Sequence, residues 1–151
     1  MAMAAKSFGR RPREEAVATK PAASLGAVLE LLRALNWFIR ADIPWPTQRG
    51  QVFDFVLAGE SGVFAMWMHE GEPAGVVDAA AELGRLLGGV SVRPVVCRAT
   101  SSLTQADSGI LFCTPETALD LLVGLPAYMG QTPIPTIVNR LRELVVPLPP
   151  E

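Results

Sequence analysis

The 151-residue sequence predicts an α/β fold in which helices cover both faces of a mixed central sheet. Half of the residues are hydrophobic, which is enough for a sizeable core in a single domain of this length. Apolar residues recur with helical spacing in some segments and form short strand-like runs in others. Three of these runs are joined by very short links, which is typical of an antiparallel three-strand meander.

The first helix is predicted over residues 21–36, where apolar residues recur at steps of three and four and Pro21 suits a first turn. Its apolar positions are Leu25, Val28, Leu29, Leu32 and Leu35. Three strands follow at residues 37–46, 51–59 and 62–69. "TQRG" is a turn and "ES" a tight connection, so these strands form the meander.

A second helix is predicted over residues 72–89, with Val76, Val77, Ala80, Leu83, Leu86 and Leu87 on its apolar side. It crosses to a strand at residues 90–99, whose continuous apolar run indicates burial on both faces. A polar loop leads to a short strand at 110–114, and helices follow at 115–125 and 132–145. The predicted order is α-β-β-β-α-β-β-α-α.

Charge is unevenly distributed along the chain, although the net charge is only −2. Lys6, Arg10, Arg11 and Arg13 lie in a flexible basic tail at residues 1–13 that contains no acid. Such a tail either contacts nucleic-acid phosphates or an acidic protein surface, or is simply solvated. We assign residues 14–146 to one domain and residues 147–151 to a Pro-rich tail.

Several function classes are excluded by composition. No apolar run is long enough to span a bilayer, and the N-terminus has no hydrophobic signal segment, so we expect a cytoplasmic protein without membrane contact. A single histidine leaves no Cys/His zinc cluster. Cys97 and Cys113 each lie in a strand-like run. Such positions favour reduced, packed thiols, and a disulfide between the two is kept as an alternative. Phosphate-loop and GxSxG patterns are absent.

The segment "NWFIRADIPWPTQRGQVFDFVLAGESGVFAMWMHEG" resembles the opening of the nuclease-related domain, NERD, of the PD-(D/E)XK nuclease superfamily. That family shows a strand ending near D-x-P, a strand carrying (I/F)DHVVVGP and a strand like GVFVI(D/E)TK. The later stretches "VSVRPVVCRA" and "GILFCTPETALDLLVGLP" resemble its second half. The resemblance covers roughly residues 14–144 and implies that the second helix crosses to a strand parallel to the third.

The resemblance also implies a set of catalytic positions. Nucleases of this class use Mg²⁺-like ions held by carboxylates, with a lysine beside them. By the family pattern, Asp54 matches the metal-binding Asp, Trp67 occupies the position of the acid in (D/E)xK, and His69 occupies that of the lysine. The first-helix glutamate has three candidates, Glu14, Glu15 and Glu30.

An indole cannot ligate Mg²⁺, so the resemblance points to a degenerate nuclease-like domain that binds a protein or nucleic acid. One alternative is an active metal-dependent nuclease with a rearranged site, in which Asp54 ligates Mg²⁺ or Mn²⁺ and His69 and Glu70 are catalytic. Strand alternation places Trp67 and His69 on one face and directs Glu70 to the other. A second alternative is an unrelated α/β interaction module. No cofactor is expected unless the nuclease is active.

The remaining candidates are hydrophobic. Trp37 and Trp45 flank the first strand and are predicted to be half-buried, and exposure of Trp45 would indicate an interaction patch. Trp67 is expected to pack against a helix, and Met66 and Met68 to fill the core. Candidate binding residues are therefore Trp45 and Trp67, together with Arg10, Arg11 and Arg13 of the tail.

Overall fold

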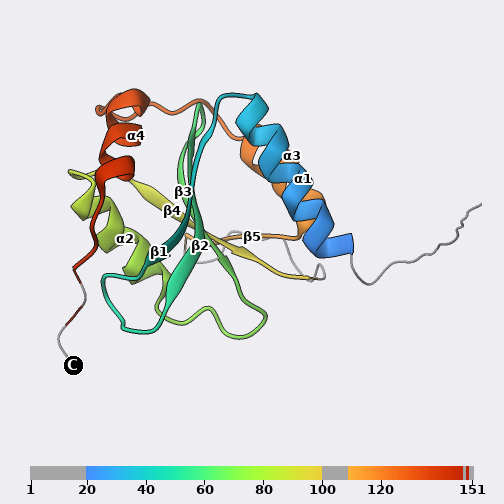
Figure 1. Cartoon of the computed structure of the whole chain (residues 1–151), viewed down its shortest axis with the longest axis horizontal. Coiled ribbons are helices and arrows are strands. Elements are labelled where there is room, and N and C mark those ends of the chain that lie inside the picture. The colour runs from blue at the N-terminus through green and yellow to red at the C-terminus, as the bar shows by residue number, and fades with distance from the viewer. Residues whose placement is uncertain (1–19, 100–108, 148, 150–151) are drawn as a thin grey trace, which may run out of the picture.

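The computed structural model describes residues 20–99, 109–147 and 149. Their elements lie in the predicted order (Figure 1). They are α1 (Lys20–Ala34), β1 (Phe38–Pro44), β2 (Val52–Gly59), β3 (Gly62–Met68), α2 (Val76–Leu86), β4 (Val92–Cys97), β5 (Leu111–Cys113), α3 (Pro115–Val123) and α4 (Ile134–Glu143). The predicted α/β class and element order are confirmed.

One mixed five-stranded sheet, ordered β1-β2-β3-β4-β5, forms the centre of the molecule. The strands β1, β2 and β3 pair antiparallel as a meander. Gly59 lies opposite Gly62 at the tight link between β2 and β3. Helix α2 then carries the chain across the sheet, so that β4 pairs parallel to β3 with Val63 opposite Val92. The short strand β5 adds a second parallel pair.

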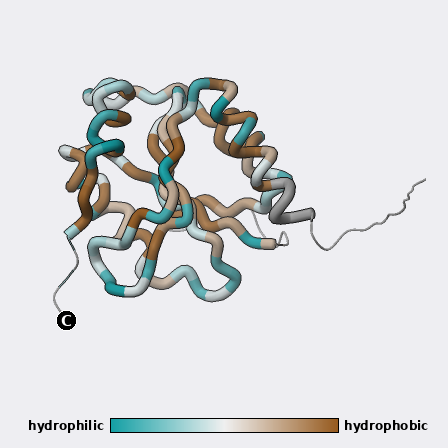
Figure 2. Tube along the Cα trace, viewed as in Figure 1, coloured by the Kyte–Doolittle hydropathy of each residue, from teal (hydrophilic) through white to brown (hydrophobic). Residues whose placement is uncertain are grey.

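Two hydrophobic clusters lie on opposite faces of this sheet. The first joins the strands to α2 and α4, and the second joins them to α1 and α3. Figure 1 shows these two helix pairs on either side of the strands, and Figure 2 shows hydrophobic residues concentrated along the sheet between them. Strand β3 is buried from Gly62 to Trp67 because both of its faces are covered.

The burial of several aromatic and aliphatic side chains differs from the sequence prediction. Trp37 and Trp45 are only 4% and 1% exposed, so neither is a half-buried rim residue and Trp45 forms no surface patch. Leu35 follows the end of α1 and is 51% exposed, and Val77 lies on the outer side of α2. Periodicity identifies the inward face of each helix but misassigns residues at its margins.

The two ends of the chain differ in what can be described. The predicted tail at residues 1–13, with Arg10, Arg11 and Arg13, lies outside the described residues. Near the C-terminus, Leu144 and Val146 pack against the first cluster, and Arg49 Nε donates to the Pro149 carbonyl at 2.8 Å. Within the described ranges, no helix is both long and apolar enough to span a bilayer.

Candidate functional site

The candidate site lies where the parallel strands β3, β4 and β5 end. Their carboxyl ends meet at one edge of the sheet, where ligands of open α/β folds commonly bind. The antiparallel strand β2 begins at the same edge and brings Asp54 beside Met68 of β3. The described loop residues between β3 and α2 include His69 and Glu70, so this edge collects the three residues that sequence reasoning singled out.

Trp67 and His69 form a stacked pair at this edge. Their ring centroids are 3.8 Å apart and the planes differ by only 5°. The predicted common face of the two residues is therefore confirmed. Trp67 also meets the edge of Trp45, with centroids 4.7 Å apart, and joins the same cluster as Val76 of α2. At 7% exposure the indole is a packed core residue.

The imidazole of His69 forms a hydrogen bond with the local backbone. Its Nε2 lies 2.9 Å from the carbonyl oxygen of Glu72. Because a carbonyl only accepts hydrogen bonds, Nε2 carries the proton in this contact. His69 N also donates to Cys97 O at 3.1 Å, which extends the ladder between β3 and β4 beyond Met68. The histidine thus ends the strand and shapes the following loop.

Asp54 accepts a hydrogen bond from the backbone of the neighbouring strand. Its Oδ2 lies 2.8 Å from Met68 N, beyond the last paired residues of the ladder, Phe55 and Met66. Strand alternation also breaks here, because Phe53 packs in the first cluster and Phe55 against the second. The carboxylate replaces a ladder hydrogen bond at this irregular point, so its position has a structural cause.

Glu70 is likewise bound to backbone. Its Oε2 accepts from Ala99 N at 2.7 Å, just after β4. Arg98 Nη2 donates to Gly71 O at 3.0 Å, and its guanidinium lies over the Phe112 ring with Cζ 4.8 Å from the centroid. Glu70 and Arg98 therefore fasten the loop after β3 to the end of β4.

Sequence reasoning missed Arg98 as a residue of this edge. Its position directly after a buried strand was the available signal, because such positions collect at the carboxyl edge of parallel strands.

Cys97 and Cys113 are paired neighbours on β4 and β5 and are both buried free thiols. The hydrogen bond from Cys113 lowers the pKa of the Cys97 thiol, while burial and the negative charges of Glu70, Glu116 and Asp54 act to raise it. The same hydrogen bond and burial raise the pKa of Cys113. The hydrogen bond therefore favours a thiolate on Cys97 over one on Cys113.

Across residues 20–99, 109–147 and 149, no group of three or more His, Cys, Asp and Glu side chains is arranged to hold a metal ion. Glu30 of α1 forms a solvent-exposed ion pair with Arg33 at 3.2 Å. The other two candidates for the first-helix acid, Glu14 and Glu15, lie outside the described residues. The donor set that the resemblance implies for Mg²⁺ is therefore not assembled among the described side chains.

Two of the predicted binding residues need correction. Trp45 and Trp67 are core side chains that pack against each other and present no surface to a partner. Met68 was expected in the core but is 39% exposed, whereas Met66 is buried as predicted. The strand ends at Met68, and side chains beyond the last covered residue reach solvent.

Comparisons with protein-family models, with curated proteins and with solved structures gave no match for this chain.

Replacing Asp54 tests its structural role. We expect Asp54→Ala to lower the free energy of unfolding by about 1 kcal/mol, because the Met68 N–H loses its acceptor at a partly solvated position. Asp54→Asn keeps an acceptor oxygen, so it should lower the free energy of unfolding by about half as much or less. Urea unfolding with and without Mn²⁺ measures both effects. If Mn²⁺ stabilises the native chain and not Asp54→Asn, Asp54 is a metal ligand instead.

Proposed function

We propose that this chain is a catalytically inactive relative of nuclease-related domains and acts as a binding or assembly subunit. One observation carries the proposal. At the two positions where the resembling pattern has an acid and a lysine, a stacked Trp67–His69 pair is packed against Trp45. A buried indole supplies neither a metal ligand nor a proton-transfer group, so this arrangement supports binding without phosphodiester cleavage.

The sheet topology agrees with the resemblance to nuclease-related domains. Helix α2 leads from β3 to the parallel strand β4, as the resemblance requires. The agreement extends to the carboxyl edge, where Asp54 and the (D/E)xK-like positions fall together.

The alternative of an active nuclease finds less support. It needs Asp54, Glu70 and a first-helix glutamate to converge on a metal ion. Asp54 accepts the backbone N–H of Met68 at the end of β3, Glu70 accepts that of Ala99 just after β4, and Glu30 pairs with Arg33. Each of these contacts occupies one oxygen of its carboxylate and holds that side chain to the local backbone.

A protein partner is favoured by the outer surface of α1. Leu31 of α1 is 51% exposed, and so is Leu35, which follows the end of the helix and donates its N–H to Leu31 O at 3.1 Å. Nucleic acid is the second candidate partner, through Arg10, Arg11 and Arg13. A cytoplasmic location is part of the same proposal.

The partner can be tested by purifying the native complex with its mass determined by light scattering. We expect a defined heteromeric mass for the native chain that is lost when Leu31 and Leu35 are both changed to Lys. The matched control Val77→Lys alters an exposed apolar residue on the opposite helix layer and should retain the complex. A monomeric native chain that also fails to bind DNA and RNA contradicts the proposal.

A further inference from the structure

A cavity lies at the end of the sheet opposite to Asp54 and Glu70. It has a volume of about 240 Å³ and is formed by three separate segments: the link before β3, the start of β4 and the chain after α3. Its lining residues are Ser61, Gly62, Val63, Ser91, Arg93, Pro126, Ala127, Tyr128 and Met129. This volume is below the range of about 300–1,000 Å³ typical of sites for drug-sized ligands, so it suits a small group.

Arg93 is an unusual residue for its position on β4. Together with Val95 and Cys97 it follows the alternation of the face that packs against α1 and α3, and those two neighbours are buried in the second cluster. Arg93 itself is half-buried. In the described part of the chain it has neither an ion pair nor a hydrogen-bond acceptor. A guanidinium held partly out of water without a counter-charge is well suited to an anion.

The cavity also offers neutral donors and contains no acid. The hydroxyls of Ser91 and Tyr128 have no hydrogen-bond partner among the described residues. Ser61 Oγ is already committed, since it donates to Leu122 O at 2.7 Å. The nearby acid Glu60 does not line the cavity. Its backbone carbonyl accepts a hydrogen bond from Tyr128 N at 2.6 Å. The lining of the cavity therefore includes one cationic residue and two residues whose hydroxyls have no partner among the described residues.

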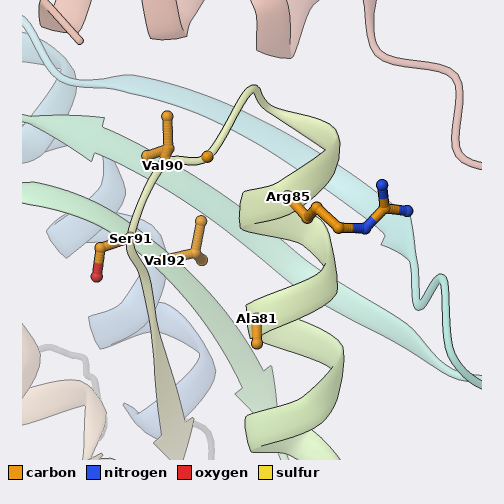
Figure 3. A pocket seen from close by; sticks show the side chains of 6 residues that line it. Ala81, Arg85, Val90, Ser91 and Val92 are labelled. Carbon is orange, nitrogen blue, oxygen red and sulfur yellow. The ribbon is translucent and has the colours of Figure 1, made fainter. Parts of the chain in front are cut away.

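A larger neighbouring pocket lacks these properties. It has a volume of about 410 Å³ and also includes Ser91, with Arg85 as its charged residue. Arg85 forms an ion pair with Glu82, and Figure 3 shows its side chain extending away from Ser91. Its charge is therefore locally neutralised and lies apart from the free hydroxyl.

We propose that the cavity around Arg93, Ser91 and Tyr128 is a binding site for a small oxyanion, either a phosphate or a carboxylate group. Arg93 pairs with two oxygens of the anion, and the two hydroxyls donate to it. Pro126, Ala127 and Met129 provide apolar contact for the group that carries the anion. This site does not depend on the proposed binding function, because it lies at the other end of the sheet.

The test is an NMR titration of the full chain with inorganic phosphate and, separately, with acetate, each at constant ionic strength maintained with chloride. We expect saturable shifts confined to the amides of Gly62, Ser91, Ala127 and Tyr128. Arg93→Met should weaken binding by roughly tenfold or more, and Tyr128→Phe by several-fold, in proportion to the lost charged and neutral hydrogen bonds. Arg85→Met is the matched control and should bind as the native chain does.

The two titrations also distinguish the possible ligands. Saturation by phosphate alone indicates a phosphate ester, saturation by acetate alone indicates a carboxylate, and saturation by both supports the shared oxyanion chemistry. The proposal is overturned if neither anion gives saturable shifts, or if Arg93→Met binds as tightly as Arg85→Met. A thermal unfolding curve of each variant establishes that it is folded during the titration.

Discussion

Trp67→Glu, which places an acid where the nuclease-like pattern has one, should strongly destabilise the protein rather than create a metal ligand. The indole is 7% exposed and packs against Trp45 and the first cluster. The change removes a large aromatic side chain, worth about 3–5 kcal/mol, and adds the cost of burying a carboxylate. We expect a loss of at least about 4 kcal/mol and a melting temperature lower by roughly 10 °C or more.

The matched control for this change is Met68→Glu, which introduces the same charge one residue later at a position that is 39% exposed. Its effect on the free energy of unfolding should stay within about 1 kcal/mol. Urea unfolding of both variants measures the difference. If Trp67→Glu is as stable as Met68→Glu, position 67 tolerates a carboxylate and the packing role of Trp67 is contradicted.

A second large effect is expected at Gly84, in the α2 crossover that makes β4 parallel to β3. A Cβ atom at Gly84 would lie 2.0 Å from the carbonyl oxygen of Val90 and 3.3 Å from its carbon, both backbone atoms. The Gly84 carbonyl also accepts the N–H groups of Gly89 and Val90, each at 3.0 Å. The link after α2 cannot move away from Gly84 without losing these hydrogen bonds, so Gly84→Ala should cost about 3 kcal/mol.

Gly26→Ala should change the free energy of unfolding in the opposite direction in the same experiment. Gly26 is an exposed residue of α1, and a methyl group added to its Cα would have no atom within 4 Å. Alanine is the better helix former, so this variant should gain about 0.5–1 kcal/mol. Urea midpoints that fall for Gly84→Ala and rise for Gly26→Ala support the close α2–β4 approach. Equal stability of Gly84→Ala and the native chain contradicts it.

Much of the fold follows from local sequence patterns. The order of elements, the meander and the common face of Trp67 and His69 depend on periodicity and link length, which act over a few residues. These features were predicted because neighbouring residues determine them. The parallel pairing of β4 with β3 was instead an expectation from the resemblance to the nuclease-related domain.

The contacts at the site depend on residues distant in sequence, which local patterns do not reveal. The burial of Trp45 results from its contact with Trp67 on another strand. The hydrogen bond of Asp54 depends on where the β2–β3 ladder ends. The cavity around Arg93 needs three segments to meet, although an arginine at a core-facing position of a buried strand was a visible signal.

The central claim is the loss of metal-dependent cleavage, and a nuclease assay tests it most directly. The full native chain is incubated with single- and double-stranded DNA and with RNA in Mg²⁺ or Mn²⁺, beside Asp54→Asn and the control Asp42→Asn on the neighbouring strand β1. We predict no cleavage by the native chain above the level of Asp54→Asn. Metal-dependent cleavage that persists in Asp42→Asn and disappears in Asp54→Asn contradicts the claim.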